Sequence, residues 1–246
     1  MSNTEAAPRA INSLAAGACD SCLRSRKCLG AVLHASTAAD GRPDHIHVVT
    51  VQRGQPLYRI GEATTSAYVV QSGALKVRRH SAAGDEEIIA FRQPGDTTGL
   101  ESLGHGVHAA EAVALSTTKV CRLPLQLLKL ELLHSAELGD RLLLEMGREF
   151  ERMQLRLQME RQSAPARVAS FLLGHLQHRR ELFGNAIDSF SLPMSRIDLG
   201  RFLALAPETV SRVFARLQQD GVVASEGHTI RILDVSMLER VAEQGE

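Results

Sequence analysis

The chain has 246 residues, of which 44% are hydrophobic and 23% are charged, so it can build a sizeable folded core, and intrinsic disorder as its main state is excluded. Its 28 lysines and arginines balance its 28 aspartates and glutamates, so net charge points to no nucleic acid, membrane or acidic partner. Because there is no apolar run of about 20 residues and no basic, apolar leader, we expect a cytoplasmic protein that does not enter a membrane.

The first residues predict a tail followed by a cluster of cysteines. Residues 1–18 are rich in small and polar side chains without apolar periodicity, which predicts a flexible tail. Cys19, Cys22 and Cys28 follow with C-x2-C-x5-C spacing, and Cys121 lies far along the chain. In a reducing compartment such a cluster favours metal binding over disulfide bonds. Four thiolates suit either an iron–sulfur cluster or a structural zinc ion, and spacing alone does not decide between them.

The middle of the chain has the pattern of an antiparallel β-structure. A loop rich in small and polar residues is expected at residues 36–43. Short β-type runs follow over residues 45–124, several of them ending at glycine. Evenly spaced short strands with glycine at the corners predict a β-roll or barrel.

Helical periodicity begins after Pro124. A short helix is predicted at residues 125–133 and a long one at residues 136–162. The long helix carries an apolar stripe at three- and four-residue steps: Leu138, Leu142, Met146, Phe150, Met153 and Leu157. Such a narrow stripe on a charged helix predicts a dimer interface, and the alternative is a helix packed against its own β-domain.

The C-terminal part has the order of a winged helix-turn-helix domain. Pro165 marks the start of a helix that ends near residue 183, followed by a strand at 189–192, helices at 196–203 and 207–220, and a hairpin at 222–233. We therefore predict an α+β protein with four parts: a tail (1–18), a cysteine loop with a β-roll sensor domain (19–135), a dimerisation helix (136–164) and a DNA-binding domain (165–246).

Three side chains on the second of the paired helices are suited to reading DNA. Glu208, Ser211 and Arg212 are expected to project together on the side opposite its apolar face. Arginine can bond guanine in a bidentate fork, glutamate can accept from cytosine, and serine can bond a base or a phosphate. The alternative is a solvated charged face on an ordinary helical hairpin.

The run LGRFLALAPETVSRVFARLQQDGVV resembles the helix-turn-helix signature of the fumarate and nitrate reduction regulator (FNR) branch of the cyclic-AMP-receptor superfamily. The resemblance extends over nearly the whole chain from Cys19. Two positions depart from the family pattern: Ala204, where glycine is common, and Pro207, where valine or threonine is usual. Neither removes a base-contacting side chain, and the resemblance implies a homodimer that binds double-stranded DNA at half-sites of the TTGAT type.

The resemblance also implies a sensor and a further partner. Regulators of this branch bind an oxygen-sensitive 4Fe-4S cluster through cysteines that match Cys19, Cys22, Cys28 and Cys121. They contact RNA polymerase through β-roll loops, and the acidic residues Asp85, Glu86 and Glu87 match such a loop. A hairpin turn with ordinary solvated charges is the alternative for these acids.

Other ligands and activities find less support. Gly99, Leu100 and Glu101 resemble part of a cyclic-nucleotide site, but Ala109 and Ala110 follow where an arginine would hold the cyclic phosphate, so we expect no cyclic nucleotide. A haem site is not expected either, because scattered histidines are interpreted as surface residues: His34, His45, His47, His80, His105 and His108. The absence of nucleotide-binding and hydrolase motifs argues against an enzyme, including an iron–sulfur redox enzyme. A structural zinc ion or a thiol redox switch remains the alternative sensor.

The expected mechanism is a population shift. Cluster assembly would anchor residues 19–28 against the strand that carries Cys121, reposition the helix at 136–162 and favour a DNA-binding dimer. Because the stripe has no acidic residue at its apolar positions, we predict that the dimer persists in the cluster-free protein.

Overall fold

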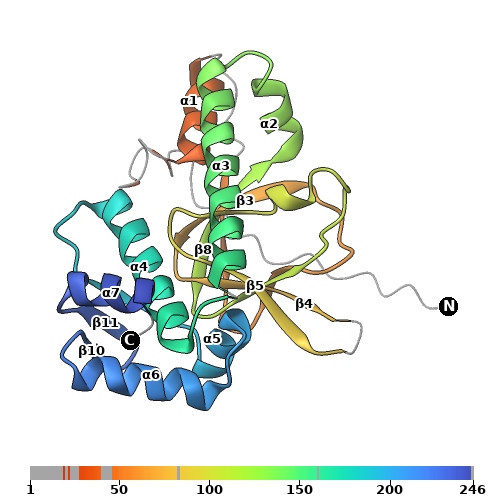
Figure 1. Ribbon diagram of the computed structural model, residues 1–246. Helices are drawn as coiled ribbons and strands as arrows, with labels where there is room; N and C mark the ends of the chain where they lie inside the picture. Colours follow the sequence, from red (N-terminus) through yellow and green to blue (C-terminus); the bar gives the residue numbers. More distant parts are fainter. Residues whose placement is uncertain are drawn as a thin grey trace.

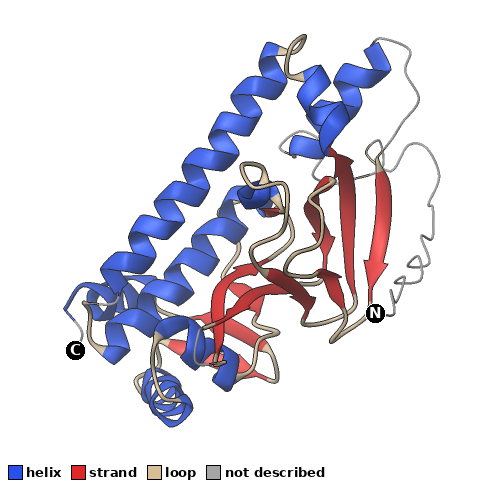
Figure 2. Cartoon of the chain, turned by 90° about the vertical axis from the view of Figure 1, so that its right-hand side faces the viewer, coloured by secondary structure: helices blue, strands red, loops and turns tan. Residues whose placement is uncertain are grey.

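The structure is a computed structural model that describes Cys19, Cys22 and residues 28–39, 46–81, 84–159 and 161–244 (Figure 1). The predicted tail at residues 1–18 and the side chain of His45 lie outside this described part. A long helix, α3 (Ala136–Met159), runs past a β-rich N-terminal part, and the C-terminal helices and hairpin gather near the end of this helix (Figures 1 and 2).

The β-rich part is an antiparallel roll, as the sequence predicts. Its strands are β1 (His47–Val51), β2 (Pro56–Tyr58), β3 (Ser66–Ser72), β4 (Leu75–His80), β5 (Glu86–Arg92), β6 (Thr97–Thr98), β7 (Glu111–Ala114) and β8 (Thr118–Pro124). They form two four-stranded sheets, ordered β1-β8-β3-β6 and β2-β7-β4-β5. At the β3–β4 corner Gly73 has φ of 81°, and a Cβ there would lie 2.6 Å from the carbonyl oxygen of Thr117, so the corner requires glycine.

A helix that the sequence analysis missed precedes the roll. Helix α1 (Leu29–Ala39) extends through part of the segment predicted as a loop from residue 36. It buries Leu29 and Leu33, one turn apart, in an apolar cluster with Leu123 of β8 and Leu128 of α2 (Leu125–Glu131). Small residues such as Ser36 and Ala38 suggested a loop, but tertiary packing of the first turns stabilises the helix.

Helix α3 begins at the predicted residue, but the predicted stripe is wrong at its start. Leu138 has 0% of its surface exposed, because it packs in the same cluster as Leu29 and Leu33. Leu142 is partly buried against that cluster. These two side chains therefore pack within their own chain, which is the alternative considered for the whole helix.

The C-terminal part is the predicted winged helix-turn-helix domain with one additional helix. Its elements are α4 (Ala164–Phe183), β9 (Ser189–Ser191), α5 (Arg196–Leu203), α6 (Pro207–Gln219), β10 (Val223–Glu226), β11 (Thr229–Ile232) and the unpredicted α7 (Val235–Gln244). Helix α7 packs on α4 and contributes Leu238 and Val241 to the core. Among the described residues, no helix has the length and apolarity needed to cross a membrane.

The core of this domain includes part of the β-roll. Ile88 and Phe91 of β5 are buried in one apolar cluster with Phe171 of α4 and Phe214 of α6. Strand β5 is thus packed against the helix-turn-helix unit, and Figure 1 shows α5 next to β5.

Candidate DNA-binding surface and cysteine site

Local sequence determines where both helices of the helix-turn-helix unit begin. The Ser195 hydroxyl caps α5 by accepting a hydrogen bond from the backbone N–H of Asp198 at 3.0 Å. Pro207 occupies the first turn of α6, where a missing N–H costs nothing. Val210 and Phe214 anchor α6 in the core, so its opposite face is directed outward.

The turn between these helices is close and strained. Ala204 has φ of 53° and ψ of 47°, and it is the one non-glycine residue with positive φ in the described part of the chain. A Cβ on Gly200 would lie 2.6 Å from the carbonyl oxygen of Leu205, so α5 needs glycine at this approach. Arg167 of α4 donates to the carbonyl oxygen of Leu203 at 2.9 Å and thereby supports the turn. Sequence reasoning missed Arg167, because its contact joins residues 36 positions apart.

Glu208, Ser211 and Arg212 are exposed on the outward face of α6. The Ser211 hydroxyl donates to the carbonyl oxygen of Pro207 at 2.9 Å, and Arg212 donates to the Thr209 hydroxyl at 3.2 Å. Both are exposed contacts within one helix, which a base or phosphate can replace. The face therefore presents a cation, an anion and a hydroxyl to the solvent, and side chains of these types can contact bases in a major groove.

None of the four cysteines forms a disulfide bond. Cys19 and Cys121 are buried, and Cys22 and Cys28 are partly buried. Cys19, Cys28 and Cys121 belong to the same apolar cluster as Leu138 of α3. Within the described residues, however, no three potential metal ligands are gathered closely enough to hold a metal ion.

The electrostatic surroundings of Cys28 connect it with its neighbours. Burial raises the pKa of the Cys28 thiol above its usual value, and the nearby Cys22 adds to this rise. Arg141 of α3 acts in the opposite direction, since a nearby cation favours the thiolate. The donor set, four thiols and a neighbouring cation, fits an anionic metal–thiolate group in its chemistry.

The segment around Gly99 and Glu101, which resembles part of a cyclic-nucleotide site, packs against other side chains of the chain. The prediction that His108 lies at the surface is wrong. Its side chain is 3% exposed, and its ring stacks on the ring of Tyr58 with centroids 3.9 Å apart. Burial lowers the pKa of His108, which favours its neutral form. Glu101 accepts from the Tyr58 hydroxyl at 3.0 Å and from the backbone N–H of Gly99 at 2.8 Å. Of the other histidines, His80 and His105 are exposed, and His34 and His47 are partly buried.

The acidic β-roll loop differs from the expected patch. Asp85 is exposed, but the side chain of Glu86 is only 15% exposed and forms ion pairs with Lys76, Arg78 and Arg201. Partial burial alone would raise the pKa of Glu86, but the bonds from Lys76 and Arg78 hold it below its usual value. Glu87 is paired with Arg79 at 2.7 Å. Glu86 and Glu87 therefore do not form a free acidic surface together with Asp85.

The outward face of α3 carries an apolar strip that starts later than predicted. Its members are 54–69% exposed, and we name them the exposed seam: Leu143, Met146, Phe150, Met153 and Leu157. They follow at steps of three, four, three and four residues, the spacing of a two-helix coiled coil. Leu143 thus takes the place that the sequence analysis gave to Leu138 and Leu142.

Comparison with known proteins gives consistent matches in both parts of the chain. Residues 166–241 match the Crp-like helix-turn-helix domain, and residues 48–133 match the cyclic nucleotide-binding domain. The chain is 38% identical over 185 residues to the transcriptional activator protein Anr of Pseudomonas protegens, covering 75% of either protein. It is 32% identical over 193 residues to the fumarate and nitrate reduction regulatory protein of Escherichia coli, covering 78% of this chain and 77% of that protein.

Solved structures agree with the sequence matches. FixK2 from Bradyrhizobium japonicum superposes with a TM-score of 0.70 and 27% identity, over 79% of this chain and 96% of FixK2. The β-roll, the long helix and the winged helix-turn-helix define a DNA-binding transcription regulator rather than an enzyme. The chain belongs to the CRP/FNR family and is an FNR-type member of it.

Proposed function

We propose that this regulator controls anaerobic gene expression as a homodimer that senses oxygen through a 4Fe-4S cluster and binds paired half-sites of the TTGAT type. The observation that carries the proposal is the common apolar cluster of Cys19, Cys28, Cys121 and the α3 residue Leu138. It brings the thiols next to the helix that bears the exposed seam. A relative in Haemophilus influenzae, 32% identical over 189 residues, is named an anaerobic regulatory protein.

Cys19, Cys22, Cys28 and Cys121 would hold the cluster, one thiolate for each iron. Bound there, a 4Fe-4S cluster supplies a group that reacts with oxygen. The chain's own part is to hold Cys19, Cys28 and Cys121 against a largely apolar cluster, which limits the access of water to these sulfur atoms.

Helix α1 supplies the route from the thiols to α3. It starts directly after Cys28, and the backbone N–H groups of Ala31 and Val32 bond the Cys28 carbonyl oxygen at 3.1 and 3.2 Å. One turn further, Leu33 packs with Leu138 of α3. A displacement of Cys28 therefore moves a helix that is in direct contact with the start of α3.

The exposed seam is the surface we assign to the dimer contact. Two copies that pair through it would bury Phe150 and its neighbours and place their α6 helices on one side. For half-sites one helical turn apart, the two recognition helices must lie about 34 Å from each other. Each half-site would then be contacted at its bases by Glu208, Ser211 and Arg212. We place the protein in the cytoplasm, together with the DNA it binds.

Two further parts of the proposal concern partners. We expect no cyclic nucleotide as a ligand, since Ala109 and Ala110 offer no counter-charge to a cyclic phosphate. RNA polymerase contacts the β-roll loop through Asp85, the one acid there that has no ion pair among the described contacts and is exposed to solvent.

Anaerobic purification tests the sensor directly. We expect about four irons and four sulfides for each chain, with visible absorbance that bleaches in air together with sequence-specific DNA binding. Cys121→Ala should lose the iron, whereas Val120→Ala, a truncation of a buried neighbour on β8, should keep it. A zinc-loaded protein, or an iron-free one whose DNA affinity follows thiol oxidation, would replace the cluster with the zinc or thiol alternative.

A further inference from the structure

The first helix of the helix-turn-helix unit is joined to the β-roll of its own chain by two ion pairs. Lys76 of β4 contacts Asp198 of α5 at 2.7 Å, and Glu86 of β5 contacts Arg201 of α5 at 2.5 Å. The paired residues are 122 and 115 positions apart in the sequence. We call these two ion pairs the latch.

The β-roll side of the latch is held rigidly within its own sheet. Lys76 and Glu86 also contact one another at 2.8 Å, and Arg78 bonds Glu86 at 3.2 Å. Arg78 is held in turn by Glu111 of β7 at 2.7 Å. Because three neighbouring strands supply these charges, the latch groups cannot shift without disturbing the sheet.

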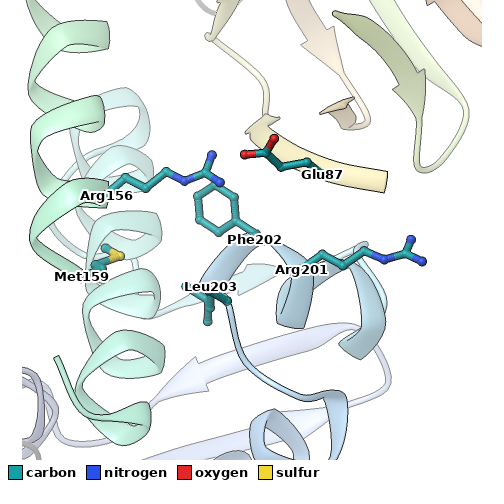
Figure 3. Close-up of a pocket in the computed structure, with 7 residues that line it drawn as sticks. Glu87, Arg156, Met159, Arg201, Phe202 and Leu203 are labelled. Carbon is teal, nitrogen blue, oxygen red and sulfur yellow. The ribbon is translucent and has the colours of Figure 1, made fainter. Parts of the chain in front are cut away.

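The apolar contact beside the latch is extensive but less directional. The ring of Phe202 from α5 lies 5.2 Å from the ring of Phe91, and Arg156 of α3 stacks over Phe202 at 4.8 Å (Figure 3). A cavity of about 210 Å³ remains between Glu87, Arg156 and Phe202. Apolar contact around a cavity permits small rotations, whereas ion pairs with defined partners fix one orientation.

We propose that the latch sets the angle of the recognition helix relative to the β-roll and thereby determines which spacing between half-sites the dimer accepts. Helix α6 follows α5 through the strained turn at Ala204, so the orientation of α5 fixes that of α6. Adding one base pair moves a half-site by about 3.4 Å and turns it around the DNA axis. A rigidly held recognition helix rejects such a change, and a loosened one follows it.

The inference rests on the proposed function, namely paired binding of DNA by a dimer. The test uses the full chain, purified anaerobically, and a series of palindromes that differ only in the spacer between half-sites. The latch variant combines Lys76→Met with Glu86→Gln, which removes the β-roll partners, keeps the net charge and leaves the helix-turn-helix sequence intact. The matched control combines Arg79→Met with Glu87→Gln, a pair on the same two strands that forms no ion pair with α5.

We expect the native protein and the control to bind the best spacer roughly tenfold more tightly than spacers one base pair longer or shorter. The latch variant should bind the best spacer with nearly native affinity but discriminate by only about threefold or less. Melting curves check folding, and Lys76→Met alone, the milder change, should show a partial loss of discrimination.

If the double latch variant and Lys76→Met both fold and still discriminate between spacers as the native protein does, the role of the latch is refuted while the proposed function stands. Equal loss in the control would overturn it as well, since the effect would then belong to the hairpin in general. A native protein that binds no paired half-sites at all would instead refute the proposed function.

Discussion

Replacing Ala204 with glycine should stabilise the protein, although glycine usually weakens a folded chain. Ala204 has φ of 53° and ψ of 47°, in the left-handed region, which costs a residue with a Cβ about 1–2 kcal/mol. Glycine avoids this strain but loses about 0.5–1 kcal/mol through its more flexible unfolded state. The difference predicts a stabilisation of about 0.5–1 kcal/mol, or a rise in Tm of about 1–4 °C for a chain of this size.

Ala215→Gly is the matched control for this prediction. Ala215 is exposed in the middle of α6, so the same substitution there should destabilise by about 1 kcal/mol. Both variants are measured by urea unfolding under anaerobic conditions, with the native chain beside them. If Ala204→Gly lowers the unfolding free energy, the left-handed turn is not under strain and the reasoning fails.

The remaining predictions concern the dimer, pH and activation. Phe150→Glu should weaken dimerisation by about a hundredfold or more in sedimentation experiments, because two buried rings are lost for each dimer, whereas Leu155→Glu, off the seam, should not. The cluster-free native protein should remain dimeric at micromolar concentration, and a monomer would contradict this. Burial lowers the pKa of His175 to about 3, so the folded state resists protonation of this side chain. The contribution of neutral His175 to the free energy of unfolding is fully present above pH 6.5, and the unfolding free energy should fall by about 2 kcal/mol by pH 5. His175→Phe should reduce that fall, and an equal fall would contradict the assignment. Asp85→Lys should reduce transcription activation without changing DNA affinity, and unchanged activation would remove RNA polymerase as its partner.

Local patterns in the sequence were sufficient to predict most elements of the fold. Alternating residues with glycine at the corners identify the strands of the roll, and Ser195 and Pro207 mark where α5 and α6 begin. Helix α1 was missed because its stability comes from packing of Leu29 and Leu33 against distant elements, which no local pattern reveals. The periodicity of apolar residues is a property of one segment, and it does not show which distant elements pack against that segment.

The errors at the candidate sites have the same physical origin. The steps along α3 fit both Leu138 and Leu143, and only the cluster around α1 and β8 shows that Leu138 is already covered. The sequence predicts Glu86 as an acidic residue of an exposed loop, but Arg201, 115 residues away, forms an ion pair with its carboxylate. His108 has a polar side chain in a glycine-rich loop, yet stacking on Tyr58 buries it.

Helix α3 links the cysteine site with the DNA-binding domain, and its two faces make different contacts. Phe150 belongs to the exposed seam, while the adjacent Glu149 forms a bidentate pair with the buried Arg92 of β5 at 2.6 and 2.7 Å. Arg152 bonds the buried carboxylate of Asp96 at 2.6 Å, and His178 of α4 lies 3.5 Å from the same carboxylate. Because Arg92 and Asp96 are buried, separating either from its partner on α3 would leave an uncompensated buried charge, so α3 and the roll are constrained to move together. We therefore expect a displacement at the start of α3 to be carried along the helix toward its contacts with α4.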